Sequence, residues 1–373
     1  MQGRLDITPS RPRRVRIADV AAEIGITKGT VSRALNGHPD IADGTRARVR
    51  RVAQRMGYVP LGTAQAIRTG RCRAIGLVLE TEEHDAHRPF LTDFLAGLSQ
   101  GAAAEAWTLT VATAPLGASL DTYRRLLDER KVDGFVLPRT RRDDPRVAML
   151  RAVDTPFVLF GGHGDPDGCA WFDVDGAAAM RAAAILLARR GHRRIAYVGG
   201  HPDYTYSALR EEGLRDGMRS AGLDLPEAMI RRGALDRADG AAAAGSLLDA
   251  ATPPTALVYA LDRAALGAWR AARDRGLVIG RDLAVLGYDG DPEGLHAEPP
   301  LATWAVDWHR AGARLADLLI RRVRGEPPET LRETMPATFL DRGSASCGAG
   351  ASPNADRGAA AAESPESTGR NDS

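Results

Sequence analysis

Cysteine is scarce in this sequence, and its few residues are isolated from one another. Cys72, Cys169 and Cys347 are far apart in a chain of 373 residues, and no CxxC pair occurs. A structural zinc site or a disulfide framework needs closely spaced or paired cysteines. We therefore expect reduced thiols, with no metal site and no disulfide.

Long hydrophobic runs are also missing. A membrane-spanning helix needs about 18 consecutive apolar residues, and the longest run here, around residues 182–188, is mostly alanine. The N-terminus reads MQGRLDITPSRPRRVR, which is basic but lacks the apolar segment of a secretory signal. We therefore expect a cytoplasmic protein without a membrane partner.

Common catalytic motifs are absent as well. The sequence contains no GxSxG, no P-loop and no HExxH. Its glycine-rich stretch GGHGDPDG, residues 161–168, does not fit the dinucleotide pattern G-x-G-x-x-G and does not directly open a helix. The sequence therefore does not favour an enzyme, and we expect neither a cofactor nor a metal ion.

Charge is distributed unevenly along the chain. Residues 1–73 contain fifteen Lys or Arg against five Asp or Glu, a net charge of +10. Because the whole chain carries only +2, the other 300 residues carry −8. A basic head on an acidic body indicates a polyanionic partner for the head alone. A disordered basic arm is the alternative explanation, and it fits residues 1–14 only.

Helical periodicity begins directly after this arm. Apolar residues recur at i, i+3, i+4 and i+7 over residues 17–24, which predicts one face of a helix. Thr27 can cap a second helix, and a third begins near Thr45 and ends at Gly57. Three helices with a tight turn between the first two predict a helix-turn-helix module.

The second helix exposes short polar and cationic side chains. Thr and Ser hydroxyls donate hydrogen bonds to phosphates, and their small size lets a helix approach the DNA backbone. Arg33 could reach O6 and N7 of guanine in the major groove, and Lys28 lies where a recognition helix meets base edges. An ordinary solvated surface is the alternative, which the turn, the third helix and the local charge disfavour. The residues expected on DNA are Thr27, Lys28, Gly29, Thr30, Ser32, Arg33 and Asn36.

From residue 74 the pattern changes to alternating strands and helices. Buried-strand runs such as AIGLVLE and WTLTVATA are separated by helical stretches, and the alternation restarts after FGGHGDPDG. Such alternation implies parallel sheets with right-handed crossovers. Two rounds predict two similar α/β lobes with a ligand cleft at the carboxyl ends of their strands. Residues 343–373 are small, polar and of low complexity, and we expect them to be disordered.

A resemblance to the LacI/GalR family of bacterial transcription regulators covers nearly the whole chain except the arm and the tail. It is dense over residues 15–60, which read VRIADVAAEIGITKGTVSRALNGHPDIADGTRARVRRVAQRMGYVP, and it returns in ARRGHRRIAYVGG, LGYDGDP and PPLATW. The resemblance implies a small all-α helix-turn-helix domain followed by a two-lobed α/β body like that of periplasmic sugar-binding proteins.

The resemblance also implies roles for particular residues on DNA. Lys28, Gly29 and Arg33 occupy base-reading positions, and the other polar residues of the second helix occupy backbone-positioning ones. The linker resembles the family's hinge helix, which folds on operator DNA and inserts an apolar side chain into the minor groove. Ile67 is the matching residue, and Arg68 beside it is expected on DNA too. The linker departs from the family pattern at Leu61, Gly62, Gln65 and Ala66.

In the body, Arg210 and Asp289 match effector-contacting positions of the family. Arginine can donate several hydrogen bonds to sugar hydroxyls and aspartate can accept paired ones, although core packing or an ordinary ion pair is the alternative. The other residues expected in the cleft are Phe160, His163, Trp171, Asp173, Tyr206, Asp262 and Trp304. The chain departs from common family residues at FGGHG, Leu261 and Val306, so no particular sugar is implied.

The expected domains follow from these boundaries. They are a basic arm (1–14), the helix-turn-helix domain (15–58), the hinge (59–72), the two-lobed body (73–342) and the tail (343–373). Within the body we expect an N-lobe of about 73–162 plus 292–322 and a C-lobe of about 163–291 plus 323–342.

Together these features predict a homodimeric repressor of carbohydrate-utilisation genes. It would bind a pseudo-palindromic operator DNA and respond to a sugar-like effector between the lobes. A corepressor-type regulator that responds to a non-sugar metabolite would use the same geometry and stays open. A transport receptor would need a signal peptide, and a sequence-neutral DNA-binding protein would not need a body of 270 residues.

Overall fold

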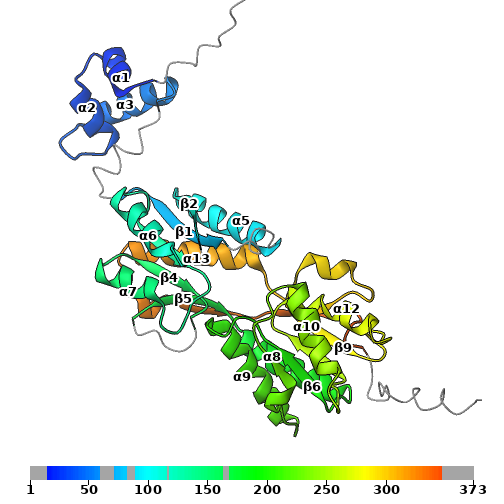
Figure 1. Ribbon diagram of the computed structural model, residues 1–373. Coiled ribbons are helices and arrows are strands. Elements are labelled where there is room, and N and C mark those ends of the chain that lie inside the picture. The colour runs from blue at the N-terminus through cyan, green and yellow to red at the C-terminus, as the bar shows by residue number, and fades with distance from the viewer. Residues whose placement is uncertain (1–14, 59–70, 82–88, 116, 163–167, 347–373) are drawn as a thin grey trace, which may run out of the picture. The chain divides into compact units, whose positions relative to one another are not determined.

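The computed structural model describes residues 15–58, 71–81, 89–115, 117–162 and 168–346. The chain divides into two compact units, Met1–Cys72 and Arg73–Ser373, which we call the head and the body and describe separately (Figure 1). The head holds three helices, α1 (Ile17–Ile24), α2 (Lys28–Leu35) and α3 (Asp43–Arg55).

The head has a small core shared by its three helices. Val20, Val31 and Val49, one from each helix, are completely buried against one another. Gly25 ends α1 in the left-handed conformation, with φ of 76°. Thr27 caps α2, because its Oγ1 accepts a hydrogen bond from the Thr30 amide at 3.1 Å. The expected helix-turn-helix is therefore confirmed, although the third helix begins two residues earlier than the sequence predicted.

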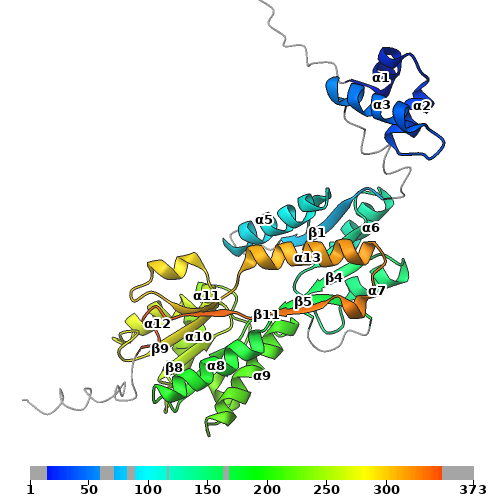
Figure 2. The same cartoon turned by 180° about the vertical axis from the view of Figure 1, so that it is seen from behind.

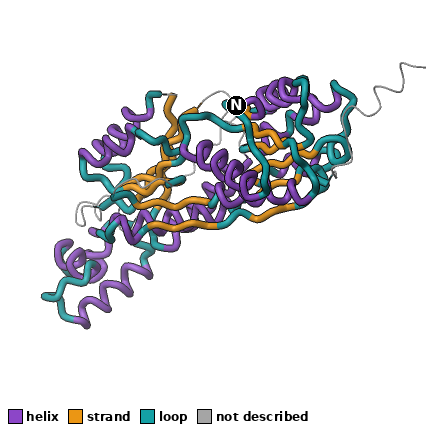
Figure 3. Tube along the Cα trace, turned by 90° about the horizontal axis from the view of Figure 1, so that it is seen from below, coloured by secondary structure: helices purple, strands orange, loops and turns teal. Residues whose placement is uncertain are grey.

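The strands of the body form two separate sheets, which are seen as two groups of strands in Figure 3. The first sheet defines the N-lobe, and its described strands are all parallel in the order β11-β5-β4-β3-β1-β2. These strands are β1 (Ala74–Thr81), β2 (Thr108–Pro115), β3 (Gly134–Leu137), β4 (Phe157–Phe160), β5 (Ala170–Val174) and β11 (Arg332–Met335). Its helices are α5 (Pro89–Ala104), α6 (Ser119–Asp128), α7 (Pro145–Ala152) and α13 (Trp308–Val323).

The second sheet defines the C-lobe. Its described strands follow the order β12-β10-β9-β8-β6-β7, and only β12 among them runs antiparallel to its neighbour. They are β6 (Ile195–Val198), β7 (Ile230–Arg231), β8 (Ala256–Tyr259), β9 (Ala284–Asp289), β10 (Ala302–Ala305) and β12 (Thr338–Leu340). The helices are α8 (Gly176–Arg189), α9 (Thr205–Ser220), α10 (Arg237–Leu248), α11 (Asp262–Ala265) and α12 (Ala268–Arg273), with short 3₁₀ turns η2 (Glu227–Met229), η3 (Pro292–His296) and η4 (Pro328–Thr330).

Two helices of the N-lobe pack with their backbones in close contact. A Cβ atom at Gly97 of α5 would collide with the carbonyl oxygen of His309, and one at Gly312 of α13 would collide with that of Phe94. Glycine at these positions lets α5 and α13 approach closely, and Figure 2 shows α13 lying along the sheet. Because Gly97 meets His309 and Gly101 meets Ala313, the helices run parallel, and their N-termini lie together.

The lobe boundaries predicted from the sequence are wrong in three places. Strand β5 belongs to the N-lobe sheet, β10 to the C-lobe sheet and β11 to the N-lobe sheet again. The reason is that the chain crosses between the lobes three times: between β5 and α8, between β10 and α13, and between β11 and β12. The alternation of strands and helices in the sequence does not indicate which lobe's sheet a strand will join.

Candidate functional site

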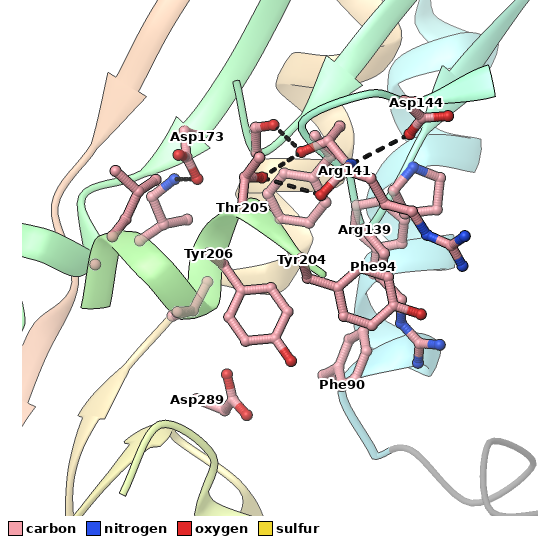
Figure 4. A pocket seen from close by; sticks show the side chains of 18 of the residues that line it. Phe90, Phe94, Arg139, Arg141, Asp144, Asp173, Tyr204, Thr205, Tyr206 and Asp289 are labelled. Carbon is pink, nitrogen blue, oxygen red and sulfur yellow. Dashed lines mark hydrogen bonds between the residues drawn. The ribbon is translucent and has the colours of Figure 1, made fainter. Parts of the chain in front are cut away.

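A cavity of about 430 Å³ lies between the two lobes at the carboxyl ends of their parallel strands. Its size falls in the usual range of small-molecule sites. Strand ends of the N-lobe contribute Glu80, Phe160 and Asp173, and the C-lobe contributes residues from the start of α9 and Asp289 from the end of β9 (Figure 4). The predicted cleft at the carboxyl ends of the strands is therefore present.

Arg210 is the buried cation of this cavity. It lies on the first turns of α9, and 8% of its surface is exposed. Its Nη1 donates a hydrogen bond to the carbonyl of Ala260 at 2.6 Å, and its guanidinium lies 3.6 Å from the ring centre of Tyr288. Gly176 at the start of α8 leaves room for it, since a Cβ there would come within 3.1 Å of the arginine. These contacts hold the guanidinium in one place.

Asp289 faces Arg210 from the end of β9. Its Oδ1 lies 3.9 Å from Nη1 of Arg210, and its side chain is 18% exposed. Burial raises the pKa of Asp289 well above its usual range, and the Arg210 guanidinium opposes that rise. The residue has φ of 125°, a strained conformation for a side chain other than glycine. A strained acid beside a fixed cation is typical of a binding site.

Three further predicted residues line the same cavity. Phe160 lies at the end of β4, Asp173 accepts a hydrogen bond from the Val174 amide at 2.8 Å, and the ring of Tyr206 stacks on Tyr204 with 5.8 Å between centres. Arg210 also lies 4.8 Å from the ring centre of Tyr206. The structure thus brings together five of the predicted effector residues, Phe160, Asp173, Tyr206, Arg210 and Asp289.

The other predicted effector residues do not line the cavity, and His163 lies outside the described residues. Trp171 lies two residues farther from the carboxyl end of β5 than Asp173 does, and it covers Gly162. Trp304 packs on Phe339 of β12, with 5.2 Å between ring centres. The sequence placed both tryptophans near strand ends. It could not show which residues their side chains would contact, and these contacts lie outside the cavity.

Asp262 is completely buried, so the expectation that it contacts an effector directly does not fit this structure. Its Oδ2 accepts hydrogen bonds from the amides of Gly290 at 2.9 Å and Asp291 at 2.8 Å. The hydroxyl of Thr303 donates to the same carboxyl group at 2.8 Å. Burial raises the pKa of Asp262 to about 7, and these hydrogen bonds oppose the rise. Asp262 therefore fixes the turn that follows Asp289.

Several residues of the cavity were missed by the sequence analysis. The segment after β3 supplies Arg139, Thr140, Arg141, Asp144 and Arg146. It follows directly on a buried strand, so the rule that ligands bind at carboxyl ends could have identified it. Phe90, Phe94 and Trp308 also line the cavity, but their helical spacing resembles ordinary core packing.

Four residues join the lobes beside the cavity, and we call them the interlobe clasp: Thr140, Arg141, Tyr204 and Thr205. The Thr205 amide donates to the Thr140 carbonyl at 3.0 Å, and the two threonine hydroxyls lie 2.7 Å apart (Figure 4). Arg141 and Tyr204 form an isolated antiparallel bridge, with the guanidinium 5.6 Å from the tyrosine ring centre. The clasp therefore couples the relative position of the lobes to the wall of the cavity.

In the head, helix α2 presents the residues predicted to contact DNA. Thr27, Lys28, Gly29 and Arg33 are exposed, while Thr30, Ser32 and Asn36 are half-buried. Asn36 donates from Nδ2 to the Ser32 hydroxyl at 3.3 Å. The guanidinium of Arg33 forms an ion pair with Asp40 in the turn after α2. Ile67 and Arg68 of the hinge lie outside the described residues.

The described part of the chain has neither a metal-binding cluster nor a membrane-spanning helix. It contains no group of three or more His, Cys, Asp or Glu side chains placed to hold a metal ion. None of its helices combines the length and the hydropathy that crossing a bilayer requires.

Comparisons with known proteins agree with this arrangement. The family model "Bacterial regulatory proteins, lacI family" matches residues 16–60, and "Periplasmic binding protein-like domain" matches residues 185–345. The HTH-type transcriptional regulator AglR of Rhizobium meliloti is 34% identical over 326 residues, which cover 84% of this chain and 90% of AglR. The chain belongs to the LacI family. Its relatives are transcriptional regulators, so this LacI-family protein is a regulator and not an enzyme.

Other LacI-family members extend the comparison. The regulator CelR of Thermobifida fusca is 32% identical over 89% of this chain and 98% of CelR. A solved CelR–cellobiose complex matches 89% of this chain and all of that chain, with 30% identity and a TM-score of 0.69. The lac repressor dimer bound to operator and an anti-inducer has a TM-score of 0.74 over 89% of this chain and 99% of that chain. At 22% identity that match shows the fold alone.

Proposed function

We propose that this LacI-family regulator is a repressor of carbohydrate-utilisation genes, which binds operator DNA through its head and releases it when a sugar occupies the cavity. The observation that carries the proposal is the pairing of Arg210 with Asp289 in a cavity between the lobes of a chain that also has a helix-turn-helix head. Such a regulator works in the cytoplasm, where the chromosome lies.

At the DNA end, helix α2 would enter the major groove. Lys28 and Arg33 would donate hydrogen bonds to base edges, and Gly29, which has no side chain, would let the DNA backbone approach the helix closely. The hydroxyls of Thr27, Thr30 and Ser32, with the Asn36 amide, would position the helix on phosphates. Two heads of a homodimer would bind the two halves of a pseudo-palindromic operator, with Ile67 and Arg68 of the hinge on the DNA between them.

At the effector end, the cavity offers hydrogen-bonding groups of both kinds. Asp289 and Asp173 would accept hydrogen bonds from hydroxyl groups, and Arg210 would donate them. The face of Tyr206 suits the apolar face of a pyranose ring. The related CelR was solved with cellobiose, which supports a sugar as the ligand class. A coupling of about 1–3 kcal/mol between effector and operator would suffice for regulation.

A DNase footprint tests the proposal. The full-length protein should protect a pseudo-palindromic site upstream of carbohydrate-utilisation genes, and a sugar should release that protection. Sedimentation should show a dimer. Protection that is independent of sequence, or that no sugar changes, would contradict the proposed function.

A further inference from the structure

The charged groups that line the cavity neutralise one another. Asp144 and Arg146 form a nearly buried pair with 2.6 Å between Oδ2 and Nη2, and Arg141 lies 3.8 Å from Glu80. Arg210 lies 3.9 Å from Asp289. In total the described lining has four arginines, Arg139, Arg141, Arg146 and Arg210, against five acids, Glu80, Asp144, Asp173, Asp175 and Asp289.

This balance decides what charge a ligand can carry. A phosphate group would bring up to two negative charges into a partly desolvated site, where an unpaired charge costs several kcal/mol. Phosphate-binding sites therefore have an excess of cationic or amide donors aimed at the anion. The cavity has one more acidic than basic side chain, so its side chains offer no surplus positive charge for a phosphate.

One wall of the cavity is aromatic, and we call it the aromatic wall: Phe90, Phe94, Phe160 and Trp308. Phe90 and Trp308 have ring centres 4.5 Å apart, and Phe94 stacks on Phe160 with 5.3 Å between centres. The wall exists because α5 and α13 run parallel with their N-termini together at the cavity. Phe90 and Phe94 are seen on α5 in Figure 4.

The aromatic wall borders directly on the polar end of the cavity. The indole Nε1 of Trp308 donates a hydrogen bond to the backbone carbonyl of Asp289 at 3.1 Å. A ligand bound to the Asp289 side chain and extending past it therefore reaches the wall. Saccharide rings combine hydroxyl edges with apolar C–H faces, so they fit a site in which polar groups adjoin aromatic rings.

We propose that the effector is an uncharged saccharide of at least two rings, with one ring held by Arg210 and Asp289 and the next lying on the aromatic wall. This inference rests on the proposed function, in which a sugar occupies the same cavity. It adds two restrictions: phosphorylated sugars are rejected, and a monosaccharide leaves the wall uncovered and binds more weakly.

Calorimetry on the full-length protein tests the inference. The probes are neutral disaccharides (cellobiose, maltose, sucrose, melibiose and lactose), their component monosaccharides, and the corresponding 6-phosphates. At least one disaccharide should bind about tenfold or more tightly than its monosaccharides, because one additional aromatic contact is equivalent to roughly that factor. The phosphates should not bind. A phosphate that binds more tightly than its parent sugar, or a monosaccharide that binds as tightly as every disaccharide, overturns the inference.

A variant then tests the wall itself. Phe90→Ala removes a half-buried ring, and it should weaken the disaccharide about tenfold while leaving the affinity for its monosaccharide unchanged. Phe339→Ala is the matched control, since Phe339 packs on Trp304 outside the cavity. A merely structural role of Phe90 would weaken both sugars equally, and that result would refute the second ring site.

Operator binding distinguishes failure of this inference about the effector from failure of the proposed function. If a sugar phosphate or a monosaccharide alone releases the operator, the inference fails and the proposed function stands. If no sugar of the panel binds or changes operator affinity, both fail.

Discussion

Replacing Asp262 by asparagine should weaken effector binding although this side chain does not line the cavity. Asp262 accepts hydrogen bonds from the amides of Gly290 and Asp291, the two residues after Asp289. Asp289 has φ of 125°, and such strain costs about 1–3 kcal/mol. We propose that the anchored turn compensates for this strain and keeps the Asp289 carboxyl group directed at Arg210.

The magnitude follows from the nature of these hydrogen bonds. A bond to a charged group contributes about 1.5–3 kcal/mol, and one between neutral groups contributes about 0.5–1.5 kcal/mol. Asp262→Asn keeps the size of the side chain but makes two such bonds neutral, so the turn loses roughly 2 kcal/mol. That loss equals the strain at Asp289, so a large share of molecules should leave the binding conformation. Effector affinity should then fall by at least about twofold, and by up to about 30-fold where the full 2 kcal/mol is lost from binding.

Calorimetry with the bound sugar, at pH 8 where Asp262 is ionised, measures this effect. The control is Asp282→Asn, because Asp282 also accepts a backbone hydrogen bond, from Val278 at 2.8 Å, but lies outside the cavity. Operator affinity without sugar should stay unchanged in both variants. An unchanged sugar affinity in Asp262→Asn, or an equal loss in the control, would show that the turn needs no anchor.

Four further outcomes are expected. Arg33→Ala should lose about 1–3 kcal/mol of affinity for operator and much less for random DNA, measured by fluorescence anisotropy, and equal losses would exclude base reading. Asp40→Asn removes the ion-pair partner of Arg33, so affinity for random DNA should rise severalfold and the preference for operator over random DNA should shrink. The control Asp43→Asn, which removes a different ion pair of the head, should leave that preference intact. Asp289→Ala should bind operator normally but no longer release it with sugar in a footprint; retained release would remove Asp289 from the site. Burial raises the pKa of Asp262 to about 7, so the folded chain binds that proton more tightly than the unfolded chain. The free energy of unfolding should therefore fall by about 3 kcal/mol between pH 4 and pH 7 relative to Asp262→Asn. Denaturant titrations that give parallel pH profiles for the two proteins would refute this assignment.

The sequence predicted the head well because local rules determine it. Apolar spacing gave α1 with its observed bounds, and Thr27 caps α2 as a threonine before a helix should. The start of the third helix was placed too late, at Thr45. The residue that precedes it, Ala42, makes no side-chain cap, so the usual capping signal for a helix start is missing.

The body was predicted less completely, because its pairing is not local. The strands expected from the sequence did not include β5 and β10, and neither short segment indicates the sheet with which it pairs. For the same reason the site was predicted in part. Arg210 and Asp289 were found from motifs, whereas the aromatic wall depends on the parallel packing of α5 and α13, which are separated by some two hundred residues.

The three crossings between the lobes bear on how this protein is made. One lobe lacks β11 and the other lacks β12 until residues 332–340 have left the ribosome. During synthesis β5 and β10 therefore stay at the edges of their sheets until nearly the whole body has been translated, and a premature stop before residue 332 damages both lobes at once. Nascent chains of this protein should need protection from aggregation until that late moment.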